Sequence, residues 1–377
     1  MKIILAPDSF KGSLSAVEAA EAMAVGVRMA DPRIQTILLP VADGGEGTME
    51  SMVKATDGSI VMHSVEDPLG RPVTAGYGVL DNQPVCVIEI AEASGLTLLS
   101  KEELDPLNAS SFGTGELIRH ALDAGFREFI IGLGGSATND GGAGILQALG
   151  AKLLDKNGTP LLHGGQPLSE LDVIDLSGFD PRIQESRFTI ACDVDNPFIG
   201  PTGASAIFGP QKGATPEMVK ELDHCLSVFA DKIEAITGIS LHQVTGAGAA
   251  GGAAGIFLAF FPSKLHTGID VVLEAVDFDK NIQTADLILT GEGRSDHQTL
   301  SGKAPVGIAK AARRAGIPVV LLSGGIVESS LEELAPYFEK MYALADGSIP
   351  VEQVIRNAYD LLVEKTKFAI QTIQTAG

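Results

Sequence analysis

The chain has 377 residues, 45% of them hydrophobic, with 44 glycines and a formal net charge of −21. This length predicts two domains, and so many glycines in a non-repetitive, apolar chain indicate tight turns between strands and helices. The charge argues against a nucleic-acid or anionic-membrane partner, whose phosphates demand a basic surface, but leaves open a small anionic ligand held by local positive groups.

The cysteines and the N-terminus are typical of a cytoplasmic protein. Cys86, Cys192 and Cys225 match neither a metal-site spacing nor a disulfide framework. The N-terminal apolar run is too short for a signal peptide, and the longest apolar region, residues 246–261, is too short to cross a bilayer. We therefore expect a soluble, reduced, cytoplasmic protein with no membrane partner.

The first third of the chain alternates strands with polar loops. Residues 3–6 are predicted as a strand, and residues 7–12 as a loop that carries Asp8 and Lys11. A helix then runs to about residue 29, with Ser15 and Glu18 as a capping box. Residues 34–39 form a second strand, followed by a Gly-rich turn with Asp43 and Glu46. Residues 60–65, 73–80 and 85–90 follow as antiparallel strands without intervening helices.

The middle of the chain returns to helices and strands. We predict helices at 110–125, 215–236, 246–261 and 267–275, with 246–261 as a tightly packed Gly/Ala helix. A strand at 128–133 leads into the Gly-rich loop 133–144 and a helix that ends near residue 149. A strand at 188–191 ends in a loop with Asp193 and Asp195.

The stretch 286–305 combines a short buried strand with an unusually charged loop. Residues 287–289 are predicted as the strand, residues 290–296 as the loop, and a helix follows from Lys303 to Arg314. Strands at 319–322 and 341–344 and a closing amphipathic helix at 351–371 complete the prediction.

These elements predict an α/β protein with two α/β domains. The larger is Rossmann-like with a mainly parallel sheet, and the smaller is mixed α/β and formed from inserted segments. We assign residues 1–62, 108–190 and 280–377 to the first and residues 63–107 and 191–279 to the second. The polar loops after the strands are expected to converge at one edge of the sheet, where ligands bind in such folds.

Acidic and basic side chains gather in these loops in a way that favours phosphoryl transfer. Magnesium prefers one or two carboxylates plus phosphate oxygens, and transfer to an alcohol needs a carboxylate near the hydroxyl and cations around the moving group. Two familiar phosphate motifs do not fit. GLGGSA at 132–137 lacks the immediate helix of a dinucleotide fingerprint, and Gly302-Lys303 lacks the remaining residues of a Walker A loop.

Seven segments together resemble the type I glycerate kinase family. They are PDSFKGSLSA at 7–16, PVADGGEGT at 40–48, GLGGSATNDGGAG at 132–144, ACDVDNPFIGPTGA at 191–204, FGPQKGA at 208–214, GAGAAGGAAG at 246–255 and TGEGRSDHQTLSGKAP at 290–305. The resemblance covers essentially the whole chain in order. It implies two α/β domains and ATP-dependent phosphorylation of D-glycerate to 2-phosphoglycerate in glycolate, glucarate or galactarate breakdown.

Under this resemblance the charged loops receive hypothetical roles. Glycerate would lie between the domains, with Arg294 and Lys11 on its carboxylate and Asp8 or Asp296 on its hydroxyl. One or two of Asp43, Asp193 and Asp195 would hold Mg²⁺, Asp193 also counting among the catalytic residues. ATP would meet the two Gly-rich loops; the residues expected there are Gly134, Gly135, Ser136, Thr138, Asn139, Gly291, Glu292 and Lys303.

Other readings stay open at this point. The product could be 3-phosphoglycerate, or the acceptor another small hydroxy acid. A non-catalytic sugar-acid-binding regulator would bind glycerate without ATP turnover, and a hydroxy-acid dehydrogenase would bind a nicotinamide at 132–137. The expected partner is the small-molecule substrate D-glycerate; we expect no nucleic acid and no membrane, with a homodimer left open.

Overall fold

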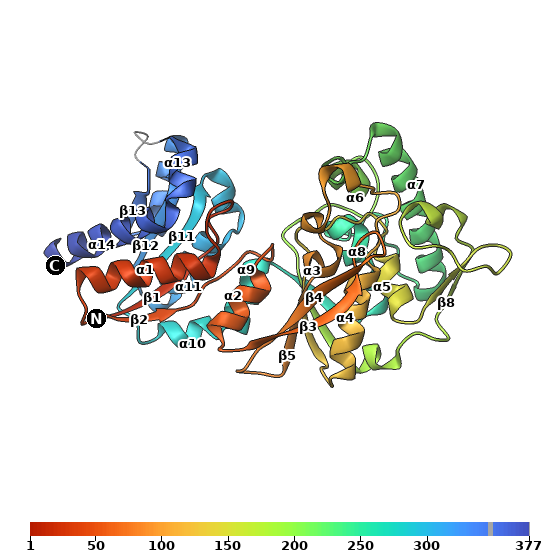
Figure 1. Cartoon of the computed structure of the whole chain (residues 1–377), viewed down its shortest axis with the longest axis horizontal. Coiled ribbons are helices and arrows are strands. Elements are labelled where there is room, and N and C mark those ends of the chain that lie inside the picture. Colours follow the sequence, from red (N-terminus) through yellow and green to blue (C-terminus); the bar gives the residue numbers. More distant parts are fainter. Residues whose placement is uncertain (346–349, 377) are drawn as a thin grey trace. The chain divides into compact units, whose positions relative to one another are not determined.

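The computed structural model describes residues 1–345 and 350–376, which form two compact units. Unit 1 contains Met1–Asp43, Glu50–Gly58 and the chain from Thr267 onward. Unit 2 contains Gly44–Met49 and Ser59–His266. Unit 2 is therefore an insertion between the two ends of the chain, which meet in unit 1 (Figure 1).

Unit 1 is built on a five-stranded sheet in the order β13-β12-β11-β1-β2, with every neighbouring pair parallel. The strands are β1 (Lys2–Pro7), β2 (Gln35–Leu38), β11 (Leu287–Ser295), β12 (Val319–Ile326) and β13 (Lys340–Ala343). This is the flavodoxin-like strand order. Along the chain, β2 is added on one side of β1, and β11, β12 and β13 are added on the other side, so the order of the strands reverses between β1 and β11. Ligands of such sheets bind outside the carboxyl ends of the strands at that reversal.

Helices cover both faces of this sheet. They are α1 (Ala16–Ala30), α2 (Thr48–Ala55), α9 (Gly268–Ala275), α10 (Phe278–Ile282), α11 (Ala304–Ala315), α12 (Leu331–Leu334), α13 (Val351–Arg356) and α14 (Ala358–Ala376). Ile3 and Leu5 point into a core with α1 and α14, which lie side by side in Figure 1. Ile4 is also fully buried, on the opposite face, because successive side chains of a strand alternate.

Local sequence explains how α1 begins and why it packs so closely. The Ser15 side chain accepts from the Glu18 backbone N–H and the Glu18 side chain accepts from Ser15, so the predicted capping box is confirmed. Farther along α1, a Cβ on Gly26 would lie 2.5 Å from the Val363 carbonyl oxygen of α14. Any larger residue there would push the two helices apart.

Unit 2 is built on a six-stranded mixed sheet in the order β10-β9-β6-β5-β4-β3. Its strands are β3 (Ser59–Glu66), β4 (Pro72–Val79), β5 (Val85–Glu89), β6 (Glu128–Gly132), β9 (Arg187–Ala191) and β10 (Ser263–His266). β3, β4 and β5 pair antiparallel as the sequence predicts, and the remaining pairs are parallel. β7 (Lys152–Leu154) and β8 (Val173–Asp175) form a separate two-stranded sheet.

The helices of unit 2 enclose one continuous apolar core around this sheet. They are α3 (Ile90–Ser94), α4 (Phe112–Asp123), α5 (Ala143–Ala148), α6 (Ala204–Phe208), α7 (Pro216–Thr237) and α8 (Ala253–Phe260). Phe198, Phe229 and Phe257 are fully buried in that core. The long helix α7 begins at Thr215, whose side chain accepts from the Met218 backbone N–H.

The α/β fold with one parallel and one mixed sheet agrees with the sequence, but several bounds differ. Residues 108–190 lie in unit 2 instead of the Rossmann-like part, because β6 pairs with β5 and β9. Only α8 is an α-helix within 246–261, since Ala250 and Gly251 adopt left-handed backbone angles. The closing helix is split into α13 and α14, and strand β11 continues through residues 290–295, where a loop was expected.

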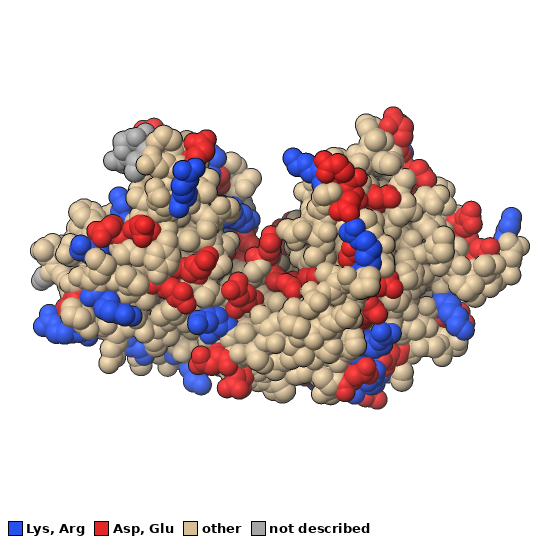
Figure 2. All heavy atoms as spheres, viewed as in Figure 1, with Lys and Arg blue, Asp and Glu red and all other residues tan. Residues whose placement is uncertain are grey.

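The surface carries both charges. Among the described residues on the face shown in Figure 2, Lys and Arg side chains are interspersed with Asp and Glu and do not gather into one basic patch. Within residues 1–345 and 350–376, none of the helices combines the length and the apolar character that a membrane span would need.

Candidate active site

A cavity of about 630 Å³ lies in unit 1 at the carboxyl ends of β1, β11 and β12. This is the reversal point of the sheet, where the fold favours ligand binding. Its charged lining consists of residues predicted from the sequence: Asp8, Lys11, Asp43, Glu292, Arg294, Asp296 and Lys303. The structure thus brings together side chains from both ends of the chain.

Asp8 is the most strongly perturbed carboxylate of this cavity. It directly follows β1, is only 6% exposed, and its Oδ1 accepts from the Ser9 backbone N–H at 2.6 Å. Burial raises the pKa of Asp8 from 3.8 to about 7, and the charges of Asp43 and Glu292 add to the rise, against the effect of Ser9 and Lys11. A carboxyl group with such a pKa can exchange a proton near neutral pH.

Glycine lets the loop after β1 approach β11 closely. A Cβ on Gly293 would lie 3.0 Å from the Lys11 backbone nitrogen and 3.3 Å from Phe10. A Cβ on Gly324 of β12 would in turn lie 2.3 Å from the Gly293 carbonyl oxygen. The three strand ends that form the cavity can therefore pack this tightly only with glycine at these positions.

Glu292 holds the segment after β11 in place. Its side chain is 4% exposed, and Oε1 accepts from the Ser295 hydroxyl at 2.8 Å and the Thr299 hydroxyl at 2.7 Å. Burial raises the pKa of Glu292, whereas these two hydroxyls and Lys303 act to lower it. The predicted nucleotide-binding role of Glu292 stays a prediction, and the contacts indicate a positioning function.

Asp296 and Arg294 differ in how firmly they are held. Asp296 caps the 3-10 helix His297–Ser301, because its Oδ1 accepts from the Gln298 backbone N–H at 2.9 Å. The Arg294 side chain is 73% exposed, and its Nε lies 3.8 Å from Asp296 Oδ2. Arg294 is therefore available for an anionic ligand, whereas Asp296 already has a structural partner.

Lys303 stands at the start of α11. It is the N-cap residue of that helix and lines the cavity. The first N–H groups of a helix carry partial positive charge, so phosphate oxygens are favoured at this point. The exposed side chain of Lys11 adds a second ammonium group to the lining of the cavity.

Of the other predicted site residues, Gly291 lies within β11 of unit 1, where its nucleotide-binding role stays a prediction, and the rest lie in unit 2. Asp193 and Asp195 are exposed in the loop after β9, and Gly134 and Gly135 lie in the loop after β6. A Cβ on Gly134 would approach the Gly45 Cα to 2.7 Å, so these two Gly-rich loops of unit 2 pack against each other. The sequence predicted that all the polar loops converge at one edge of a single sheet. In the structure these loops instead follow the strands of two different sheets.

A buried lysine supports the Gly-rich loop of unit 2. Lys212 is 1% exposed, and its Nζ donates to Ser136 Oγ at 2.9 Å and to the Thr138 carbonyl oxygen at 2.5 Å. Burial lowers the pKa of Lys212 to about 7, and the charge of Asp140 opposes this change. Lys212 belongs to the FGPQKGA segment, which was the only signal of this role in the sequence.

Thr138 and Asn139 are less accessible than the sequence suggested. Both side chains are fully buried, and Asn139 Nδ2 donates to Ser205 Oγ at 2.9 Å. Thr138 Oγ1 and Asn139 Oδ1 have no hydrogen-bond partner among the described residues. Their direct contact with a nucleotide stays a prediction, and the geometry places them inside the loop.

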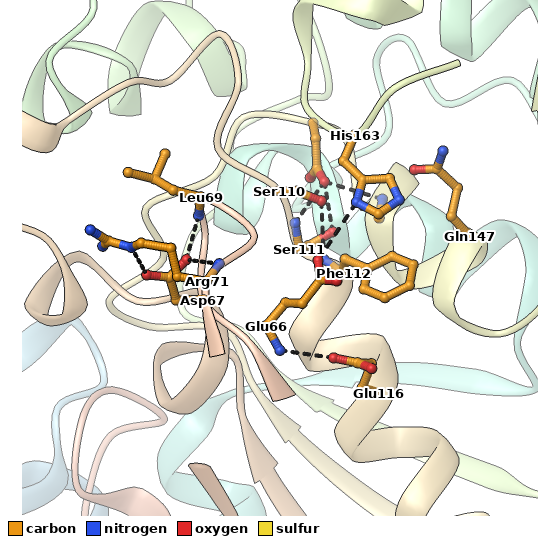
Figure 3. A network of polar contacts seen from close by, with 12 residues as sticks. Glu66, Asp67, Leu69, Arg71, Ser110, Ser111, Phe112, Glu116, Gln147 and His163 are labelled. Carbon is orange, nitrogen blue, oxygen red and sulfur yellow. Dashed lines mark hydrogen bonds and ion pairs between the residues drawn. The ribbon is translucent and has the colours of Figure 1, made fainter. Parts of the chain in front are cut away.

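Asp140 is a structural anchor of unit 2. It is fully buried; its Oδ2 accepts from the Ser111 backbone N–H and hydroxyl, both at 2.8 Å, and its Oδ1 accepts from the Gly142 N–H at 3.0 Å. Figure 3 shows Ser111 in this network, beside Ser110 and Phe112 at the start of α4. A single carboxylate therefore ties α4 to the loop that starts α5.

Sequence reasoning did not identify Glu89 at the end of β5. Its side chain is 5% exposed, and Oε1 accepts from the Thr48 backbone N–H at 3.0 Å. Burial raises the pKa of Glu89 to about 7, and Glu92 and Glu46 contribute to the rise. The sequence could not indicate this role, because a single Glu at the end of an apolar strand matches no motif. The contact between Glu89 and Thr48 arises only in the tertiary fold.

The carboxylates of unit 1 fit a magnesium ion that is shared with phosphate oxygens. No group of three potential metal ligands occurs among the described residues, so they form no closed protein cage. Mg²⁺ in nucleotide-dependent enzymes needs only one or two carboxylates. Burial is the main cause of the raised pKa of Asp8, but the charges of Asp43 and Glu292 add to it, and a cation in the cavity would offset these charges.

Comparison with known proteins identifies glycerate kinases as relatives of this chain. The model of the glycerate kinase family matches residues 3–374. A glycerate kinase of Bacillus subtilis (strain 168) is 48% identical over 100% of this chain and 98% of its own length. The glycerate 2-kinase of Escherichia coli (strain K12) is 43% identical over 99% of this chain and 98% of its own.

The fold comparison agrees with the sequence comparison. A crystal structure described as glycerate kinase 2 from Salmonella typhimurium LT2 matches with a TM-score of 0.90 and 44% sequence identity. The match covers 100% of this chain and 99% of that chain.

Proposed function

Because this chain belongs to the glycerate kinase family, we propose that it transfers the γ-phosphoryl group of ATP to the 2-hydroxyl of D-glycerate, with Mg²⁺. The Escherichia coli relative is named a glycerate 2-kinase, which supports this hydroxyl as the acceptor. The single observation that carries the proposal is the buried Asp8 in a cavity that also holds three cationic side chains.

The charges of the cavity suit the substrate and the reaction. Arg294 and Lys11 would pair with the glycerate carboxylate, and Lys303 with the start of α11 would hold phosphate oxygens. Asp8, rather than the capping residue Asp296, would orient the 2-hydroxyl and take its proton as the oxygen attacks the γ-phosphorus and ADP leaves.

Magnesium would neutralise charge that develops on the transferred phosphoryl group. Asp43 is the candidate ligand of Mg²⁺ in this cavity, because it lines the wall and its charge acts on Asp8. Asp193 and Asp195, the other two candidates, stay predictions.

The product decides the proposal. After incubation of the purified protein with D-glycerate, ATP and Mg²⁺, we expect ³¹P NMR to show 2-phosphoglycerate. A 3-phosphoglycerate signal would keep the family and reverse the pose of the substrate. Absence of any phosphoester, in folded protein that binds ATP, would overturn D-glycerate as the acceptor.

Replacing Arg294 with alanine should raise the KM for D-glycerate about tenfold or more, because a charge-assisted contact to a carboxylate is lost. The KM for ATP should change much less. Steady-state kinetics with each substrate varied in turn would measure both values.

Arg314→Ala is the matched control for this experiment. Arg314 lies in the last turn of α11 and is 65% exposed. Its guanidinium nitrogen is 3.4 Å from Asp279 Oδ1, and it does not line the cavity. If both variants changed the KM for glycerate equally, or if Arg294→Ala left it unchanged, Arg294 would not hold the carboxylate.

A further inference from the structure

The unit 1 cavity has two chemically different ends. One end carries the charged groups described above, including Asp8, Lys11 and Lys303. The other end is apolar and lies between the end of β12, the end of β13 and helix α13; its lining includes Ile326, Val327, Leu344, Val354 and Ile355. Glycerate is small and polar throughout, so it has no group that would use the apolar end.

Helix α13 presents apolar side chains that stand exposed among the described residues. Val351 is 69% exposed and Ile355 is 44% exposed, and both line the cavity. Residues four apart lie on the same face of a helix, so these two form one apolar wall. Val354 of α13 and Ala358, the first residue of α14, are buried, which shows that α13 is packed and that the exposed pair is not simply a frayed end.

Gly325 leaves open space at the same wall. It lies in β12 opposite Arg294 of β11 and lines the cavity. A Cβ at this position would meet no atom within 4 Å, and its backbone is not in the left-handed region. The protein itself therefore does not require glycine here, and the space in front of it is available to a ligand.

We infer that the apolar end binds the purine base of the nucleotide phosphate donor, with its phosphates directed to Lys303 and the start of α11. A nucleotide is an amphipathic ligand with a flat base at one end and anionic groups at the other, which matches the two ends of this cavity. Pockets for such ligands are largely apolar with a few convergent polar groups, and a volume of about 630 Å³ lies in their range.

This inference rests on the proposed kinase function and adds where the base lies. It assigns recognition of the base to α13 and the end of β12, and it leaves the charged end for phosphates and glycerate. Since the base is not a reacting group, changes at the apolar end should act on nucleotide affinity more than on the chemical step.

The decisive variant is Gly325→Val, whose Cβ would meet no protein atom within 4 Å and whose side chain would occupy the open space at this position. We expect the Kd for ATP–Mg²⁺, measured by calorimetry without glycerate, and the KM for ATP to rise about tenfold or more. The KM for D-glycerate should stay within about twofold, and the melting temperature should be unchanged. Unchanged ATP affinity, or a rise in the KM for glycerate instead, would overturn the inference.

Two matched substitutions, each of a partly exposed isoleucine on a helix, supply a second test. Ile355→Ser should weaken ATP binding, whereas Ile236→Ser, at an isoleucine 47% exposed on α7 of unit 2, should not. Equal effects of the two variants would contradict a base site at α13. The two hypotheses fail separately, because the calorimetric ATP measurement reports the base site even if the wild-type protein does not phosphorylate D-glycerate.

Discussion

Replacing Asp8 with asparagine should lower kcat by about 100-fold or more, because the variant can no longer take the proton of the substrate hydroxyl. Asparagine has nearly the same shape, and its side-chain oxygen can still accept the Ser9 backbone N–H. We expect the KM for ATP to change little. A coupled assay of ADP release, with glycerate and ATP varied in turn, would measure these constants.

The control is Asp279→Asn, which changes an exposed aspartate of unit 1 that pairs with Arg314 and should leave kcat unaltered. If Asp8→Asn kept near-normal kcat and KM, the assignment of Asp8 would be wrong. Asp296, the alternative from the sequence, would then be the next carboxylate to replace.

The same Asp8→Asn variant should be more stable than the wild type at neutral and alkaline pH. Raising the pKa of Asp8 from 3.8 to about 7 means that folding opposes its ionisation, at a cost of roughly 4 kcal/mol once it is fully ionised. The folded state binds more protons than the unfolded state between these two pH values. The contribution of Asp8 to wild-type stability should therefore fall as the pH rises from about 4 to about 7.

Denaturant titrations of both proteins across this pH window would measure the effect. The stability advantage of Asp8→Asn should grow with rising pH and level off above the folded-state pKa. A constant difference between the two proteins from acid to alkaline pH would mean that Asp8 does not titrate as its surroundings indicate.

Replacing Asp140 with alanine should destabilise unit 2 by about 3–5 kcal/mol. The substitution removes the negative charge that acts on the buried Lys212 and leaves several hydrogen-bond donors without an acceptor. The Ser111 and Gly142 backbone N–H groups would lose their acceptor, and the start of α5 would lose its tie to α4. Thermal and urea unfolding, followed by circular dichroism, would report the loss.

Asp195→Ala provides the contrast, since Asp195 is an exposed loop aspartate of the same unit and should change stability by less than about 0.5 kcal/mol. Ser111→Ala should fall between the two. If Asp140→Ala unfolded like the wild type, the network around Asp140 would contribute little, and a direct role of Asp140 in the reaction would need testing.

Much of the fold was readable because local signals are strong. Ser15 and Glu18 marked the start of α1, and β-type runs at 60–65, 73–80 and 85–90 gave the antiparallel part of unit 2. The division of the chain was less accessible. Nothing local to residues 128–132 indicates that β6 pairs with β5 and β9, since that pairing is decided by contacts distant in sequence.

The site was partly predictable for the same reason. Asp8, Lys11 and Lys303 follow strands or begin helices, and the parallel sheet collects such positions at one edge. The sequence did not indicate how many sheets there are, so it grouped loops that belong to two of them. Nor could it show burial, which separates Lys212 and Asp140 as supports from the open Arg294.

The meeting of both chain ends in unit 1 has a consequence for how the protein is made. β1 pairs with β11, and the Thr290 hydroxyl bonds to the Ala6 carbonyl across 284 positions of sequence. During synthesis β1 can therefore pair early with β2, but its other neighbour, β11, emerges only after most of the polypeptide has been made. Unit 2, almost continuous in sequence, can form in that interval. A nascent chain stalled before α14 would have a folded unit 2 but would still expose apolar core residues of unit 1. We therefore expect chaperones to bind such a chain.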